Sequence, residues 1–185
     1  MDNNSTRNLV SDILRGRTDR FAELISEFER PVYNLALRMT GLEADAADLT
    51  QDIFLRVWLN LDKYDPDRKF FTWLYTLAVN LIRNHLKKKV PRVFDDLSAQ
   101  EHRQPDASGQ GDPSVALAAK QQSLKIQELL LRLPLEQREA IFLRFFGDLP
   151  FEEIAAILGV TPGAAKMRVR RGLLRLRNLL DEPFP

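Results

Sequence analysis

The sequence contains no cysteine and only two histidines, His85 and His102, among its 185 residues. Without cysteine the chain can form no disulfide, can offer no thiolate to a metal, and cannot sense redox state through a thiol. Two isolated histidines do not supply the clustered ligands of a zinc site. We therefore expect neither a metal site nor a cofactor.

Long apolar runs are also missing. No uninterrupted apolar stretch approaches the roughly 18 to 20 residues of a membrane span. The first residues, MDNNSTRN, lack the basic and then apolar order of a signal peptide. We expect a cytoplasmic protein.

The sequence also lacks the motifs of common catalytic sites. It shows no paired nucleophile and base, and no glycine-rich phosphate loop. Gly159 and Gly163 lie at a predicted junction between two helices and do not form a P-loop. These absences predict a protein that is not an enzyme and has no small-molecule substrate.

Apolar residues make up 44% of the chain, enough for a sizeable core, and they recur with helical spacing. We expect an all-α fold of two small helical domains joined by a flexible linker, the second being a helix-turn-helix domain. The first domain, 1–90, is interrupted at Gly41 and at 64–67. Residues 91–113 are rich in Pro, Gly, Ser, Gln and Asp, and predict the linker. The second domain, 114–185, is expected to contain helices at 115–133, 135–146, 151–158 and 162–180.

The net charge is only +1, but the charges are segregated. Residues 80–92 and 161–180 carry several bases and no acid, whereas acids gather at 43–52 and 95–112. Contact with phosphates depends on where the cations lie and not on their sum. Each basic run is therefore either a solvated face or a nucleic-acid surface.

The segment "FEEIAAILGVTPGAAKMRVRRGLLRLRNLL" predicts a helix-turn-helix unit. Gly159 suits the left-handed conformation just after a helix, Thr161 can cap the next helix, and Pro162 suits its first position. We expect the residues nearest the bases to be Gly163, Ala164, Met167 and Arg168. We expect the phosphate contacts to be Lys166, Arg170, Arg171 and Arg175. The stripe that packs on the preceding helix is expected to be Ala165, Val169, Leu173, Leu176 and Leu180. A helical hairpin with a soluble basic face remains the alternative.

The segment 46–61 predicts a helix with two distinct faces. Its buried side is expected to hold Leu49, Ile53, Phe54, Val57, Trp58 and Leu61. Its other side carries two leucines among charged and polar groups, namely Asp48, Gln51, Asp52, Leu55, Arg56 and Leu59. That side is either an ordinary wet surface with scattered leucines or a docking face for a partner helix.

The segment "KFFTWLYTLAVNLIRNHLKKK" predicts a helix that is both core and surface. A broad apolar arc packs inward, and we expect His85 to be packed on that side. Trp73 projects toward the polar side with Asn80 and Asn84, next to a run of cations. This combination suits single-stranded nucleic acid, which needs a stacking platform, hydrogen-bond donors and cations. Alternatively, Trp73 tucks under the loop at 65–69.

Four segments, in this order and around a variable linker, closely resemble the extracytoplasmic-function group of bacterial sigma factors. They are "RFAELISEFERPVYNLALRMTG", "ADLTQDIFLRVWLNLDKY", "FFTWLYTLAVNLIRNHLKKK" and "LPLEQREAIFLRFFGDLPFEEIAAILGVTPGAAKMRVRRGLLRLR". The resemblance covers about 21–89 and 124–180. It implies a promoter-specificity subunit of RNA polymerase.

The resemblance implies a role for each face. The 46–61 helix would dock on the coiled coil of the polymerase β′ subunit, with the β subunit as a further contact. The 64–88 region would capture a flipped base of the minus-10 element and hold the opened strand. Its implied contacts are Lys69, Phe70, Thr72, Trp73, Thr76, Asn80, Arg83, Asn84, Lys87 and Lys88. The 162–180 helix would read the minus-35 element, and the acidic 91–113 linker would thread toward the active-site channel and RNA exit path.

The sequence departs from the family pattern at Pro150, where a serine often caps the next helix, and we expect Asp148 to substitute in part. Ala164 and Ala165 lie at positions expected to face the bases, but their side chains carry no hydrogen-bonding group. This suggests that the promoter is recognised there through the protein backbone and the shape of the DNA. We expect no further domain after Leu180, and regulation by a separate anti-sigma protein, commonly membrane-bound in this family.

Two other functions remain open. A stand-alone helix-turn-helix regulator would explain the second domain. It would give no function to the polar side of the 69–89 segment, which carries Trp73, or to the leucine-bearing side of the 46–61 helix. A structural adaptor would leave the basic helix unexplained.

Overall fold

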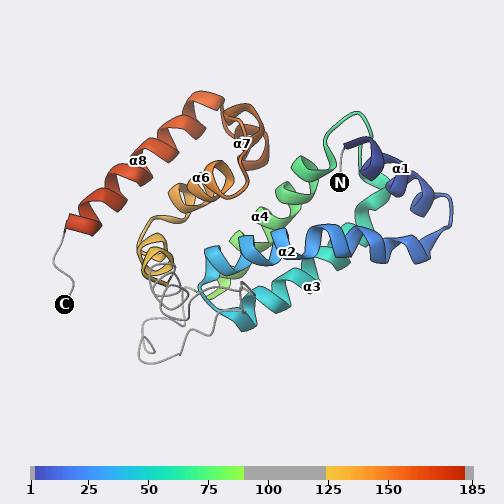
Figure 1. The fold of residues 1–185 in the computed structure, drawn as a ribbon, viewed down its shortest axis with the longest axis horizontal. Coiled ribbons are helices and arrows are strands. Elements are labelled where there is room, and N and C mark those ends of the chain that lie inside the picture. Colours follow the sequence, from blue (N-terminus) through green and yellow to red (C-terminus); the bar gives the residue numbers. More distant parts are fainter. Residues whose placement is uncertain (1–2, 90–123, 182–185) are drawn as a thin grey trace, which may run out of the picture.

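Residues 3–89 and 124–181 are described here from a computed structural model, and within these two ranges every regular element is helical (Figure 1). The helical elements confirm the predicted all-α fold. The predicted linker at 91–113 and the start of the helix expected at 115–133 lie outside the described residues. None of the helices in these ranges is long and apolar enough to cross a membrane. The elements are α1 (Asn3–Leu14), η1 (Thr18–Arg20), α2 (Phe21–Thr40), α3 (Glu43–Asn60), η2 (Leu61–Lys63), α4 (Phe70–Lys89), a helix at 124–131, α6 (Leu135–Phe145), α7 (Phe151–Leu158) and α8 (Pro162–Asp181).

Helices α1 to α4 form one lobe. Helix α2 packs along α3, and both contact α4. Gly41 ends α2 in the left-handed conformation, with φ of 77°. Helix α1 was not predicted from the sequence, because most of its residues are polar. It is held by Leu9, Val10 and Ile13, which are buried against the rest of the lobe.

Helices α6, α7 and α8 form the second lobe, and the predicted starts at Leu135, Phe151 and Pro162 are confirmed. The predicted buried stripe of α8 is wrong at two positions, since Leu173 is 42% and Leu180 59% exposed. The buried side of α8 runs through Ala165, Val169 and Gly172, and α8 packs on both α6 and α7. Because Gly172 has no side chain, Ile141 approaches closely: an added Cβ would lie 2.6 Å from Ile141 Cδ1.

The start of α7 also differs from the prediction. Pro150 precedes the helix without a side-chain cap. Asp148 has a positive φ of 49°, and its carboxylate accepts no capping hydrogen bond that the structure records. The turn is held instead by Arg144, whose Nη1 donates a hydrogen bond of 2.9 Å to the carbonyl of Leu149. Asp148 therefore does not replace the capping serine.

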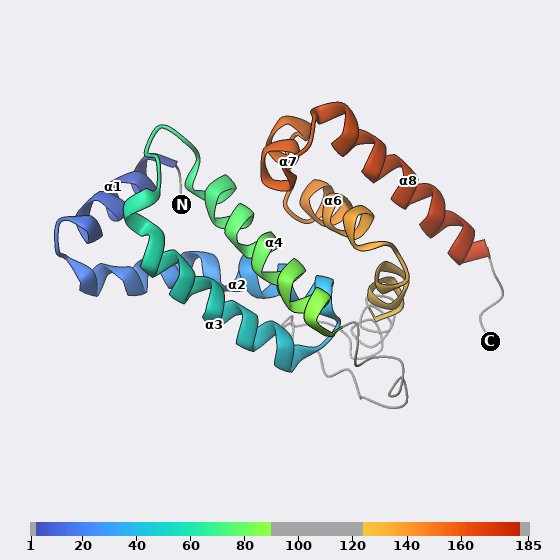
Figure 2. The ribbon, with the colours of Figure 1, turned by 180° about the vertical axis from the view of Figure 1, so that it is seen from behind.

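The two lobes pack against each other. Helix α7 lies against α4, and α6 contacts α2 (Figure 2). Apolar side chains from both lobes join in one buried cluster, which includes Leu74 and Ala78 of α4 with Leu143 and Ile154 of the second lobe. The face of α4 that looks toward α7 is thus part of an interface between lobes.

Candidate nucleic-acid and polymerase interfaces

The helix-turn-helix geometry at α7 and α8 follows from three adjacent residues. Gly159 takes the left-handed conformation with φ of 67°, and its N–H bonds to the carbonyl of Ala155. Thr161 caps α8, because its Oγ1 accepts a hydrogen bond of 3.2 Å from the N–H of Ala164. Pro162 occupies the first helical position. The predicted helix, tight turn and helix are confirmed.

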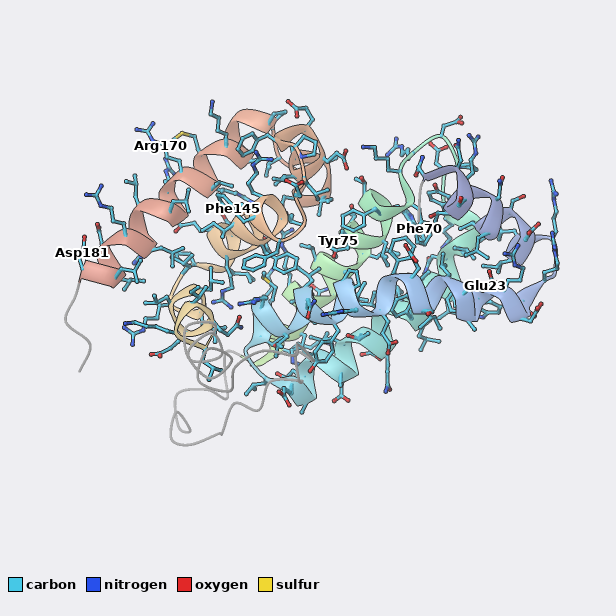
Figure 3. The ribbon with its side chains drawn as sticks, in the orientation of Figure 1. Glu23, Phe70, Tyr75, Phe145, Arg170 and Asp181 are labelled. Atoms are coloured by element: carbon cyan, nitrogen blue, oxygen red, sulfur yellow. The ribbon has the colours of Figure 1, made fainter. Side chains whose placement is uncertain are left out.

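The outer side of α8 carries a row of exposed cations. Arg170 points away from the body of the molecule (Figure 3). A side chain added at Gly163 would meet no atom within 4 Å, so the start of the helix is open to a large ligand. The exposed residues among those predicted to bind the minus-35 element are Gly163, Lys166, Met167, Arg170, Arg171 and Arg175.

Arg168 and Ala164 differ from this row. Arg168 was expected on the open side, but its side chain is only 22% exposed and pairs with Glu136 of α6, at 3.2 Å between Nη2 and Oε2. Arg168 Nη1 is buried and has no hydrogen-bond partner. Ala164 is half-buried beside the capped turn. Arg168 therefore lies at the edge of the reading surface and holds α8 to α6.

The docking face predicted on α3 is exposed at every position. Its six residues, Asp48, Gln51, Asp52, Leu55, Arg56 and Leu59, all lie at the surface. Leu55 is 57% and Leu59 60% exposed. We refer to these six residues as the α3 face.

Trp58 adds an aromatic ring to the α3 face, and the sequence analysis did not predict this exposure. It was expected in the core but is 42% exposed, with its ring 4.9 Å from that of Phe21 in an edge-to-face contact. An open groove of about 830 Å³ lies beside it. The groove is lined by Thr18, Asp19, Phe21, Ala22, Ile25, Glu29, Thr50, Gln51, Phe54, Leu55 and Trp58.

The aromatic end of α4 is more buried than predicted. Phe70 is 1% exposed and packs on Phe28 and Tyr64, so it is a core residue and not a DNA contact. Trp73 is half-buried, with its ring centre 5.5 Å from those of Tyr64 and Phe70. The Trp73 ring therefore lies partly in the aromatic cluster and retains partial exposure, which leaves both interpretations of this residue open.

The middle of the polar side of α4 faces the second lobe. Arg83 donates two hydrogen bonds of 2.7 Å to the carboxylate of Glu139, from Nε to Oε1 and from Nη2 to Oε2. These bonds raise the pKa of Arg83. Thr72 donates to Glu153 at 3.3 Å, Lys69 pairs with the same carboxylate, and the hydroxyl of Thr76 is bonded to the carbonyl of Thr72.

The remaining predicted contacts on α4 stay accessible. Asn80, Asn84, Lys87 and Lys88 are exposed. His85 is half-buried, as expected, and its Nε2 lies 3.3 Å from Asp45 Oδ2. The predicted strand-binding surface is thus split into an open part and a part covered by α6 and α7.

The comparisons with known proteins agree with this geometry. Residues 24–91 match the family model of sigma-70 region 2, and residues 123–176 match that of sigma-70 region 4. These matches place the chain among sigma-70-type factors of RNA polymerase.

Individual relatives show which group of sigma-70-type factors the chain belongs to. The chain is 33% identical over 179 residues to the ECF RNA polymerase sigma factor SigW of Bacillus subtilis strain 168, covering 94% of this chain and 95% of SigW. It is 34% identical over 167 residues to the RNA polymerase sigma factor CarQ of Myxococcus xanthus, covering 90% and 92%. The chain belongs to the extracytoplasmic-function, or ECF, family of RNA polymerase sigma factors.

Two solved structures share the arrangement of the helices. The structure of CnrH in complex with the cytosolic domain of CnrY is 26% identical, with a TM-score of 0.70 over 95% of this chain and 96% of CnrH. The sigma factor RpoE of Bartonella quintana, solved with the anti-sigma factor NepR, is 25% identical, with a TM-score of 0.68 over 88% and 98%.

Proposed function

We propose that this chain is an alternative promoter-specificity subunit that binds core RNA polymerase, reads the minus-35 and minus-10 elements, and traps the melted strand. The polymerase supplies the chemistry. The observation that carries this proposal is the presence, on one chain of this family, of a capped basic helix and a separate exposed leucine-bearing face. A stand-alone regulator would need only the first of these surfaces.

Helix α8 would read duplex DNA. A helix of this diameter fits the major groove, where the residues near its start meet base edges and more distant cations meet phosphates. Gly163 and Met167 would approach the bases, while Lys166, Arg170 and Arg171 would neutralise phosphates. The cap at Thr161 fixes the start of the helix and so the depth to which it enters the groove.

Helix α4 would hold the opened strand. The exposed amides of Asn80 and Asn84 can bond to base edges, and the cations at Lys87 and Lys88 can hold the phosphates. Extruding a base costs a few kcal/mol, so a site that accepts the extruded base favours strand opening at its own sequence. Trp73 would supply the stacking surface.

The α3 face would bind core polymerase. Two exposed leucines supply apolar anchors, and Asp48 and Asp52 surround them with negative charge. Apolar anchors provide most of the affinity at such interfaces, and the charged rim selects the partner and its register. The partner helix is expected to present apolar side chains with basic neighbours, as the β′ coiled coil would.

We also propose that a separate anti-sigma protein regulates this chain in the cytoplasm. The support comes from the two structural relatives: RpoE was solved with the anti-sigma factor NepR, and CnrH with the cytosolic domain of CnrY. This chain shares their helical arrangement over most of its length.

The proposal is tested by mixing the chain with core polymerase and genomic DNA fragments, then mapping unpaired thymines with permanganate. We expect reactive thymines at specific sites only when both chain and core are present. Tight duplex binding by the chain alone, with no strand opening when core is added, would support the stand-alone regulator instead.

A further inference from the structure

The loop between η2 and α4 contains an ordered turn at residues 65–68, which lies beside α1 at the end of the first lobe (Figure 1). The N–H of Arg68 donates a hydrogen bond of 3.0 Å to the carbonyl of Asp65 and closes the turn. The Asp65 side chain holds the turn a second time, because its Oδ1 accepts a bond of 3.0 Å from the N–H of Asp67. The backbone of the loop is therefore fixed by its own residues.

Tyr64 ties this exposed turn to the core. Tyr64 is 4% exposed, and its hydroxyl donates a hydrogen bond of 2.7 Å to the carbonyl of Arg68. Burial raises the pKa of Tyr64, so the hydroxyl stays protonated and remains a donor. One buried side chain thus anchors the far end of the turn.

The ring of Tyr64 also supports Trp73, the residue proposed to stack on the extruded base. The ring centre of Trp73 lies 5.5 Å from that of Tyr64 and 5.5 Å from that of Phe70. Both supporting residues are buried, and their own rings meet edge to face at 5.2 Å. The position of the Trp73 ring therefore depends on the same side chain that anchors the turn.

Ion pairs cover the carboxylates of the turn. Asp67 Oδ1 lies 3.0 Å from Arg7 Nη2 of α1, and Asp65 Oδ2 lies 3.4 Å from Arg68 Nε. Pairs this exposed add little to stability. They do place a cation beside each carboxylate, which reduces its repulsion of a nearby phosphate. The turn is therefore compatible with a nucleic-acid strand despite its two acids.

We propose that Tyr64 and Asp65 are positioning residues for strand opening: they hold the 65–68 turn and Trp73 in one arrangement, so that the site for the extruded base is formed before the base arrives. This role rests on the proposed function, since it concerns the same strand-binding surface. A site that is already ordered loses less conformational entropy on binding. Neither residue has to touch the DNA to act in this way.

Amide hydrogen exchange, measured by NMR on the free chain, tests the turn itself. Tyr64→Phe keeps the ring and removes one hydrogen bond, so the amides of Asp67 and Arg68 should exchange at least about threefold faster. Asp65→Ala should have the same effect. Asp65→Asn keeps an oxygen that accepts the Asp67 N–H, and it should exchange as the wild type does. Tyr33→Phe is the control, because it removes a half-buried hydroxyl from α2, and it should leave both amides unchanged.

Transcription by core polymerase with each variant tests the positioning role. The promoters carry randomised minus-35 and minus-10 regions, each linked to a transcribed barcode, so sequencing gives the base preference at every position. Tyr64→Phe and Asp65→Ala should lower the strongest minus-10 preference at least about threefold, because one bond that orders the site is lost. The minus-35 preference should not change. Asp65→Asn and Tyr33→Phe should keep both preferences.

The outcomes separate this inference from the proposed function. Faster exchange with an unchanged minus-10 preference would show that the turn serves only the fold and would overturn the positioning role. Unchanged exchange in both Tyr64→Phe and Asp65→Ala would overturn it as well. Circular dichroism checks folding, and the variants of Asp65, whose side chain is 51% exposed, decide the matter if Tyr64→Phe is unfolded. A wild-type chain that directs no transcription with core polymerase would instead overturn the proposed function.

Discussion

Arg83 of α4 and Glu139 of α6 form a two-bond ion pair across the interface between lobes, with both N–O distances at 2.7 Å. One partner belongs to the surface proposed to hold the opened strand, and the other to the lobe proposed to read duplex DNA. The pair therefore links the availability of one DNA surface to the position of the other.

Trp73→Ala should impair promoter opening more than promoter binding. Stacking of a base on an aromatic ring is worth about 1 to 3 kcal/mol, so we expect open-complex formation to fall at least about tenfold, while closed-complex affinity changes less than about twofold. Stopped-flow fluorescence of promoter DNA separates the two steps. Trp73→Phe keeps a ring against Tyr64 and should restore most of the rate. Equal loss at both steps, together with a lower melting temperature, would mean that Trp73 serves only the fold.

Asp52→Lys combined with Leu55→Asp should weaken binding to core polymerase at least about tenfold, because it removes an apolar anchor and reverses the charge of the rim. Both residues are exposed, so the helicity should not change. Affinity is measured by titrating labelled chain with core enzyme. Leu14→Asp, at a 50% exposed leucine at the end of α1, is the control and should bind normally. Undiminished core affinity of the double variant would exclude the α3 face as the docking surface.

Arg171→Ala should lower the affinity of the holoenzyme for all promoters to a similar extent. If Arg171 neutralises a phosphate, the slope of log affinity against log salt concentration should fall by about one. Filter binding at several salt concentrations measures both quantities. Arg132→Ala, which removes an exposed arginine paired with Glu128 on the 124–131 helix, should leave the slope unchanged. A loss confined to one promoter sequence would show that Arg171 reads bases.

Gly172→Val should destabilise the second lobe by about 1 to 3 kcal/mol, since the new side chain would overlap Ile141 and Gln137 where α8 crosses α6. Gly163→Ala lies on the same helix with open space around it, and it should leave stability unchanged or raise it by up to about 1 kcal/mol. Thermal and urea denaturation followed by circular dichroism measure the free energies. Equal stability of the two variants would contradict the close packing of α6 and α8.

Local chemistry predicted some elements well. Gly159, Thr161 and Pro162 set the boundary between α7 and α8 through their own backbone preferences and one side-chain cap, so three adjacent residues were enough. Helix α1 was not predicted, because it has few apolar residues and these stabilise it only after they pack on another helix.

The features that the sequence did not predict depend on packing between helices that are distant in the chain. A helical wheel placed Trp58 and Leu173 on the apolar side of their helices, so both were expected in the core. Both are exposed in the structure, because a wheel does not show where the neighbouring helix ends. Glu139 lies 56 positions from Arg83, and nothing in the residues around it indicates a partner on another lobe. The division of α4 into open and covered parts is therefore a property of the folded chain.

The most direct measurement of the central claim is sequencing of the 5′ ends of transcripts made on genomic DNA by core polymerase alone and by core polymerase with this chain. We predict that addition of the chain creates a set of start sites that share one motif near position −35 and a second near −10. The chain with Asp52→Lys and Leu55→Asp should produce the pattern of core polymerase alone. Start sites that are identical with and without the chain would contradict its role as a promoter-specificity subunit.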